Sequence, residues 1–100
     1  MSDGAPDELI HQSTRLKLMA ALEANPEPLD FSRLKAISGA TDGNLGAHLG
    51  TLEGAGYVAV DKQAIGKRTR SLVAITPSGR AAFHRHLAYL RAIIDSASLS

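Results

Sequence analysis

The segment TDGNLGAHLGTLEGAGY, residues 41–57, decides how the rest of the chain is organised. Thr41 is a favourable helix N-cap, and Asp42 places a negative charge in the first turn, where the helix dipole stabilises it. Apolar residues then recur at spacings of four and three and give a helix one apolar stripe: Leu45, Leu49 and Leu52. Gly54 and Gly56 end this helix, and the residues that follow them are strand-like.

A shorter helix is expected just upstream, over Phe31–Ser38. Asp30 is its predicted N-cap, and Leu34 and Ile37 are expected to face the core. Gly39-Ala40 connects it to the next helix. Two helices joined by a short turn that contains glycine form a helix-turn-helix, whose second helix can enter the DNA major groove.

Helical spacing also predicts an opening helix that is capped by Ser13 or Thr14 and runs to Ala24. Two prolines in the segment Asn25-Pro26-Glu27-Pro28 stop it, because proline cannot continue a helix.

Downstream of the central segment, a hairpin and a last helix are expected. Tyr57–Lys62 and Thr69–Ile75 are strand-like, and the polar, Gly-containing residues 63–68 between them are typical of a hairpin turn. Thr76-Pro77 is a helix start, with Thr as N-cap and Pro at the first helical position, and this helix is expected to run to about residue 97.

Three motifs occur in a characteristic order: TDGNLGAHLGTLEGAGYV, the basic turn GKRTR and the segment ITPSGR. In these motifs the chain resembles winged helix-turn-helix transcriptional regulators, and most closely a compact winged-helix subgroup of the MarR/ArsR type. The resemblance covers Leu9 to Ile94. It implies a mainly α (α+β) fold, a winged helix-turn-helix with a three-helix core, a two-stranded β-wing and a long C-terminal helix. We expect a flexible arm over residues 1–8 and a winged-helix DNA-binding domain over residues 9–97, with a dimerisation helix over residues 77–97.

Composition excludes several classes of protein. One hundred residues make one domain, and the absence of cysteine removes disulfides, thiolate metal sites and cysteine nucleophiles. No nucleophile elbow, phosphate loop or metal-ligand spacing is present, so we expect no enzyme, no catalytic residue, no cofactor and no metal. His84 and His86 cannot chelate one metal together, because residues two apart on a helix point to nearly opposite sides. No apolar run is long enough for a membrane span, and the start MSDGAPDE lacks signal-peptide features, so we expect a cytoplasmic protein with no membrane partner.

The charge is distributed unevenly along the chain. Residues 62–94 contain seven basic and no acidic residues, although the net charge is only +1. Four of these cations bracket the expected hairpin tip: Lys62, Lys67, Arg68 and Arg70. Such side chains can follow a phosphate backbone or enter a minor groove. The alternative is an ordinary solubilising turn. Arg33 and Lys35 on the preceding helix can add backbone contacts.

The outward face of the central helix is built of small and polar residues: Gly43, Asn44, Gly46, Ala47, Gly50, Thr51 and Gly54. Each glycine costs a helix about 1 kcal/mol relative to alanine. We interpret this face as one that lets the backbone approach DNA, although a weak helix that tolerates small residues would look the same. Relatives often carry Arg or Lys near positions 47 and 50, and without them the bidentate guanine contact is unavailable.

His48 lies on the flank of this helix, where it can contact DNA or pack against the protein. The residues of this segment that we assign to the DNA-binding site are Thr41, Asn44, Ala47, His48 and Thr51.

The last helix carries apolar residues at spacings of four, three and four: Phe83, Leu87, Leu90 and Ile94. Ala82, Tyr89 and Ile93 widen the pattern into more than one apolar face. A domain this small covers one face, so we predict a two-fold homodimer through these residues, and the alternative is an intramolecular core.

The expected function is that of a DNA-binding transcriptional regulator, a repressor that binds a pseudo-palindromic operator in double-stranded DNA as a homodimer. The recognition helix would enter the major groove, and the basic wing would hold the backbone or minor groove. The alternative is a winged-helix protein–protein interaction module with little DNA affinity, which Ala47 and Gly50 favour and the basic wing opposes. The sequence indicates no particular small-molecule effector.

Overall fold

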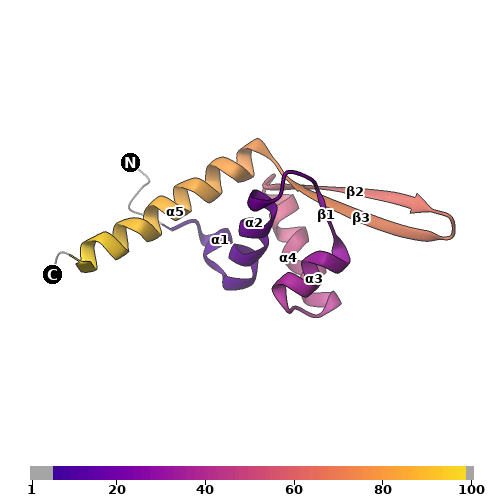
Figure 1. Ribbon diagram of the computed structural model, residues 1–100, viewed down its shortest axis with the longest axis horizontal. Helices are drawn as coiled ribbons and strands as arrows, with labels where there is room; N and C mark the ends of the chain where they lie inside the picture. The colour runs from indigo at the N-terminus through magenta and orange to yellow at the C-terminus, as the bar shows by residue number, and fades with distance from the viewer. Residues whose placement is uncertain (1–5, 99–100) are drawn as a thin grey trace.

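The computed structural model describes residues 6–98. Its helices and strands are, in chain order, α1 (Glu8–His11), α2 (Ser13–Ala24), β1 (Leu29–Asp30), α3 (Phe31–Ser38), α4 (Asp42–Gly54), β2 (Val58–Ile65), β3 (Arg68–Ile75) and α5 (Pro77–Ser98). Helices α1–α4 gather into a compact head, and the β2–β3 hairpin and α5 project from opposite ends of it (Figure 1). The molecule is therefore elongated, with extents of 58 × 25 × 22 Å.

The helix-turn-helix forms as the sequence predicts. The Thr41 hydroxyl caps α4 by accepting a hydrogen bond from the Asn44 N–H at 3.2 Å, and the leucine stripe of α4 is buried. The Asp30 carboxylate caps α3 by accepting from the Arg33 N–H at 2.8 Å, and Gly39 ends α3 at a φ of 71°. One expectation is wrong: Ile37 is 40% exposed, because Leu34 and Ser38 occupy the core face of this two-turn helix.

The opening helix is divided in two, contrary to the expectation of a single helix capped by Ser13 or Thr14. Asp7 caps α1, and its Oδ1 accepts from the N–H groups of Leu9 and Ile10 at 3.0 and 3.1 Å. The chain then bends at Gln12, whose backbone is extended and whose Oε1 accepts from the Arg15 N–H at 2.9 Å. Gln12 is therefore the N-cap of α2, and the one-turn helix α1 precedes the helix that the sequence predicts.

The last residues of the expected arm over residues 1–8 belong to the folded head, since Asp7 caps α1 and Glu8 begins it. Residues 1–5 lie outside the described part of the chain. Asp7 is held on both sides, because its Oδ2 accepts from the Tyr57 hydroxyl at 2.7 Å and its N–H donates to His86 Nδ1 at 3.1 Å. These bonds join the N-terminal segment to the end of α4 and to α5.

The sheet has three antiparallel strands in the order β1-β3-β2, so the two wing strands are joined by a third that the sequence did not reveal. β1 is only two residues long and pairs Leu29 with Val73 and Asp30 with Leu72. So short a strand has no alternation to recognise, and it exists only because β3 lies beside it.

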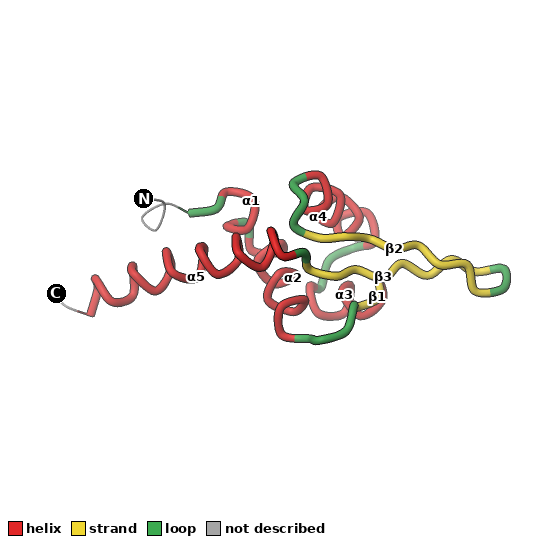
Figure 2. Tube along the Cα trace, turned by 90° about the horizontal axis from the view of Figure 1, so that it is seen from above, coloured by secondary structure: helices red, strands yellow, loops and turns green. Residues whose placement is uncertain are grey.

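The wing is longer than expected, and the predicted turn over residues 63–68 is wrong in its bounds. Pairing continues outward to Ile65 and Arg68, which leaves a turn of only Gly66 and Lys67. Gly66 adopts a φ of 62°, whereas the φ of Lys67 is not positive. A positive φ at the first of two turn residues, where glycine is favoured, is typical of a type II′ hairpin turn. All residues from 61 to 70 are exposed, so polarity here marks a solvated hairpin arm (Figure 2).

The start of α5 is anchored on the end of α4. Thr76 is the expected N-cap, since its hydroxyl accepts from the Gly79 N–H at 2.9 Å and donates to the Gly56 carbonyl at 2.6 Å. The Thr76 N–H donates to the Tyr57 carbonyl at 3.1 Å. A Cβ at Gly79 would lie 2.0 Å from the same Tyr57 oxygen, so no side chain fits there.

The core-facing stripe of α5 consists of Gly79, Ala82, Phe83 and His86. His86 is 1% exposed, and its Nε2 is the one buried side-chain nitrogen or oxygen without a hydrogen-bond partner among residues 6–98. Its ring stacks on Tyr89 and meets His11 edge-on, with ring centroids 5.8 and 5.4 Å away. Burial, with a smaller effect of His11, lowers the pKa of His86 below its ordinary value, although Asp7 and Glu8 oppose this shift.

We predict that Gly79→Ala destabilises the protein by about 3 kcal/mol or more, because the new Cβ would collide with backbone atoms that cannot move independently. Gly50→Ala is the matched control, since a Cβ at Gly50 meets nothing within 4 Å and should stabilise the helix by up to about 1 kcal/mol. Urea unfolding followed by circular dichroism measures both. Equal effects of the two substitutions would contradict the close contact.

We also predict that His86 makes the fold less stable in mild acid. The unfolded imidazole takes up a proton near its ordinary pKa of about 6.5, whereas the lowered pKa of folded His86 resists protonation. The unfolded state therefore binds more protons as the pH falls below about 6.5, and stability declines there. His86→Asn keeps an acceptor near Nδ1 but does not titrate. The slope of unfolding free energy between about pH 7.5 and about pH 5.5 should be shallower in this variant, and identical slopes would exclude the effect.

Candidate nucleic-acid interface

The outward face of α4 is exposed. Among the predicted DNA-binding residues of this helix and its cap, Thr41, Asn44, Ala47 and Thr51 are exposed. A Cβ at any of the four glycines of the face would meet no atom within 4 Å: Gly43, Gly46, Gly50 and Gly54. Packing within the protein therefore does not require glycine at these positions, and the four glycines make the helix less stable.

Two polar side chains on this face differ in their freedom. The Thr51 hydroxyl donates to the Ala47 carbonyl at 3.1 Å, so its lone pairs remain available as acceptors. The Asn44 side-chain amide makes no hydrogen bond to any residue between 6 and 98. Asn44 therefore presents both a donor and an acceptor, the combination that pairs with an adenine edge.

His48 is half-buried on the flank of α4 and is held by a residue of α2. Arg15 Nη1 lies 3.0 Å from His48 Nδ1, and Arg15 Nε donates to the Leu9 carbonyl at 2.5 Å. The sequence left open whether His48 contacts DNA or packs against the protein. In the structure, one ring nitrogen is engaged inside the protein and the ring remains partly exposed.

The four wing cations do not share one face of the hairpin. The register pairs Ile65 with Arg68 and Gln63 with Arg70, so these two arginines lie on one face. Lys62 pairs with Ser71 and lies on the opposite face, and Lys67 is at the turn. All four side chains are exposed, and the wing offers positive charge to both of its sides.

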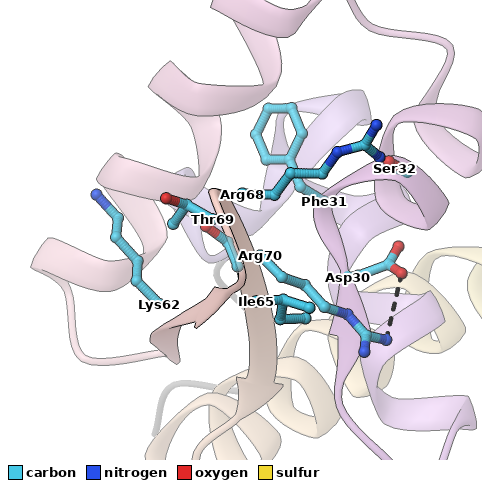
Figure 3. A pocket seen from close by; sticks show the side chains of 9 residues that line it. Asp30, Phe31, Ser32, Lys62, Ile65, Arg68, Thr69 and Arg70 are labelled. Atoms are coloured by element: carbon cyan, nitrogen blue, oxygen red, sulfur yellow. Dashed lines mark ion pairs between the residues drawn. The ribbon is translucent and has the colours of Figure 1, made fainter.

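Arg68, Arg70 and Lys62 all line a groove between the wing and the start of α3, shown in Figure 3. This groove has a volume of 620 Å³, and its apolar lining comes from Phe31 and Ile65. Asp30 forms an ion pair with Arg70 at 3.5 Å, and both side chains are partly exposed. Asp30 thus caps α3 through one oxygen and orients Arg70 through the other.

The two cations on α3, Arg33 and Lys35, are also exposed. Lys35 pairs with Asp42 in the first turn of α4 at 2.7 Å, while Arg33 makes no ion pair with any residue between 6 and 98. Arg33 is therefore the α3 cation whose charge is fully available to a phosphate.

The predicted dimer residues on α5 divide into two groups. Phe83 is 5% exposed and belongs to the core of its own chain, so it is not available to a partner as the sequence led us to expect. Leu90 is half-buried, Leu87 is 38% exposed and Ile94 is 62% exposed. Ile93 is 49% exposed, so an apolar surface remains on the part of α5 that extends beyond the head (Figure 1).

Cations on α5 have a structural use. Arg80 and His84 both bond to the Glu23 carboxylate of α2, with Arg80 Nε at 2.6 Å. The Arg80 hydrogen bond is the main reason that the pKa of Glu23 is lowered. Arg80 therefore joins two helices and does not belong to the cationic surface of the wing.

The sequence did not predict two contacts of the candidate interface. One is the contact of Arg15 with His48, and the other is the ion pair of Asp30 with Arg70. Arg15 precedes Leu18, Met19 and Leu22 at helical spacing, which places it on the core-facing stripe of α2. A cation on an apolar stripe requires a polar partner, so this position of Arg15 could have indicated a contact with another residue. The pairing of Asp30 with Arg70 had no such signal, because it depends on β1 pairing with β3.

Comparison with known proteins places this architecture in a family. Residues 14–94 match the family model described as "Winged helix DNA-binding domain". An uncharacterized protein of Methanocaldococcus jannaschii, MJ0432, is 35% identical over 80 residues, which cover 80% of this chain and 86% of that protein. The chain therefore belongs to the winged helix DNA-binding domain family.

Solved structures agree with this assignment. A transcriptional regulator homologue from Pyrococcus horikoshii OT3 superposes with a TM-score of 0.81 at 32% identity, covering 91% of this chain and 89% of that one. A MarR-family transcriptional regulator from Silicibacter pomeroyi has a TM-score of 0.67 at 26% identity, covering 90% of this chain and 59% of that one. The resemblance to MarR-type winged-helix regulators is confirmed, and these relatives are regulators rather than enzymes.

Within residues 6–98, no group of three or more His, Asp or Glu side chains is placed to hold a metal ion. No helix in that range combines the length and apolar character that a membrane span needs.

Proposed function

We propose that this protein is a transcriptional repressor that binds a pseudo-palindromic operator in double-stranded DNA as a homodimer. The observation that carries the proposal is the pairing of an uncovered, glycine-rich face on α4 with a cationic hairpin that projects from the same head. A winged-helix domain uses these two surfaces for DNA: the second helix of its helix-turn-helix reads the major groove, and charged side chains hold phosphates.

The face of α4 suits close approach to base edges. Its four glycines have no packing role within the protein, and they allow the helix backbone to come nearer to DNA than larger residues would. Asn44 supplies a bidentate partner for adenine, and the Ala47 methyl suits a thymine methyl. Because no Arg or Lys lies on this face, we expect a preference for A·T over G·C pairs at the positions that it reads.

The wing supplies affinity rather than sequence readout in this proposal. Lys67 at the tip and Arg68 beside it would contact phosphates or the minor groove, while Lys62 and Arg70 approach from opposite faces of the hairpin. Thr41 and Thr51 can bond to phosphate oxygens at the edges of α4.

The homodimer is supported by the uncovered end of α5. Leu87, Leu90 and Ile94 follow one another at helical spacing, and α5 extends beyond the head (Figure 2). Among residues 6–98, Leu87 and Ile94 stay exposed, at 38% and 62%. A second copy packed on this surface would place two recognition helices on one side of a two-fold axis, as a palindromic site requires.

One observation favours a second function, a protein-interaction module that keeps the winged-helix fold. The recognition face of α4 carries no cation, so its attraction for DNA is weaker than that of the wing. Binding to duplex DNA therefore distinguishes the two functions.

We predict that the double variant Lys67→Ala/Arg68→Ala weakens binding to mixed-sequence duplex DNA. Two lost phosphate contacts should reduce affinity for all sequences alike and lower the salt slope by about 2, because fewer counterions are released. Fluorescence anisotropy across a range of salt concentrations measures both quantities.

The matched control for the wing is Arg85→Ala/Arg91→Ala, which removes the same charge from exposed positions on α5. Its salt slope should equal that of the unchanged protein. Equal losses in the two double variants would show that net charge, and not the wing, determines DNA affinity. No binding by the unchanged protein, even at low salt, would favour the interaction module.

We predict a dimer of about 21 kDa from the 10.5 kDa chain, and a monomer when Leu90→Glu and Ile94→Glu are combined, because a charge on an apolar interface is left unpaired. Light scattering after size exclusion gives the mass. Ile65→Glu is the control, since Ile65 is an exposed apolar residue on the wing and should leave the mass unchanged. A monomeric unchanged protein would refute the interface.

A further inference from the structure

His48 lies at the border between the exposed DNA face of α4 and the buried leucine stripe, and Arg15 of α2 reaches it from inside the protein. The two residues are 33 positions apart in the sequence, and their side chains meet with Arg15 Nη1 3.0 Å from His48 Nδ1. Both side chains are half-buried, so water screens this contact only in part.

The chemistry of this pair sets the position of the imidazole proton. A guanidinium group has five N–H donors and no acceptor, so Arg15 can only donate in this contact. His48 Nδ1 must therefore be the accepting nitrogen. In a neutral imidazole the proton is then on the other nitrogen, Nε2.

The second ring nitrogen of His48 is open to solvent. No residue between 6 and 98 hydrogen-bonds to it, and within that range the only buried side-chain nitrogen or oxygen without a partner is Nε2 of His86. His48 Nε2 is therefore both unpaired and accessible. It presents an N–H on the flank of the recognition helix.

Arg15 is itself held in place from the other side. Its Nε donates to the carbonyl of Leu9 in α1 at 2.5 Å, and its backbone N–H donates to Gln12 Oε1. The bend between α1 and α2 thus brings a carbonyl oxygen to the guanidinium. With bonds at both ends, Arg15 loses little further freedom when DNA binds.

We propose that Arg15 is a positioning residue that fixes His48 as an Nε2–H donor to a phosphate oxygen at the wall of the major groove. A phosphate is the expected acceptor because flank positions of a recognition helix face the groove walls, whereas its central positions face the bases. This inference rests on the proposed function, since it assigns a role within the same DNA interface.

The tautomer is measured first, on the free protein, by ¹⁵N NMR of the imidazole nitrogens. The proposal requires protonated Nε2 and unprotonated Nδ1 in His48, and a shift toward a mixture of tautomers in Arg15→Met. The opposite tautomer in the unchanged protein would overturn the proposal whatever the protein binds. A cooperative thermal unfolding transition of Arg15→Met, above the temperature of the NMR measurement, shows that the tautomers are compared in folded proteins.

DNA affinity is then measured with two isosteric variants. His48→Gln places an amide N–H where Nε2–H lies, whereas His48→Asn places its amide near Nδ1. His48→Gln should therefore bind duplex DNA about tenfold more tightly than His48→Asn. Arg15→Met should weaken binding in the unchanged background and cause no further loss when combined with His48→Asn.

The outcomes distinguish the positioning role of Arg15 from DNA binding by the protein as a whole. Equal affinity of His48→Gln and His48→Asn, or a loss from Arg15→Met that is undiminished in the His48→Asn background, would overturn the role of Arg15 and leave DNA binding intact. In the second case Arg15 would act through its own charge. Absence of DNA binding by the unchanged protein would overturn the proposed function and this inference together.

Discussion

The contact between Gly79 and the carbonyl of Tyr57 is the constraint on which the arrangement of the whole molecule depends. The Tyr57 N–H donates to the Leu52 carbonyl at 2.9 Å, and its carbonyl accepts from Thr76. Its hydroxyl donates to Asp7 at 2.7 Å. One residue therefore joins the end of α4, the base of the wing, the start of α5 and the N-terminal segment. Because no Cβ fits at residue 79, only glycine lets α5 pack this closely against the Tyr57 carbonyl.

This junction has consequences for the proposed function. A repressor with two reading heads needs a fixed relation between its recognition helix, its wing and its dimerisation helix, because half-site spacing leaves little freedom. The elements concerned are joined here by short hydrogen bonds and a backbone contact rather than by a flexible linker. His86 extends the junction by accepting from the Asp7 N–H, so α1 is tied to α5 as well. Arg15 in turn connects α1 to the flank of α4 through Leu9 and His48.

The sequence predicted three helix caps correctly from local signals, although it placed the cap of the opening helix at Ser13 or Thr14 instead of Gln12. It failed where a neighbouring strand supplied the structure. The caps Thr41, Asp30 and Thr76 each satisfy a free N–H of their own helix, so a few adjacent residues carry all the information. The strand β1 and the full length of the wing are different. Neither has an apolar alternation, and both form because a paired strand satisfies their backbone groups. The strand residues at the tip of the wing are mostly polar because both of its faces are exposed, and the sequence therefore predicted a turn there.

By itself, the sequence determined the helix-turn-helix, the winged-helix order and the cationic hairpin tip, because spacing, caps and charge are properties of neighbouring residues. Only the tertiary structure decided which of several apolar or titratable side chains would be covered. Phe83 and Ile94 lie on the same predicted stripe, yet the head covers the first and α5 carries the second beyond it. His48 and Arg15 meet only after α2 packs on α4. A side chain's partner depends on which helices pack together, and that depends on the summed burial of the whole core rather than on any one segment.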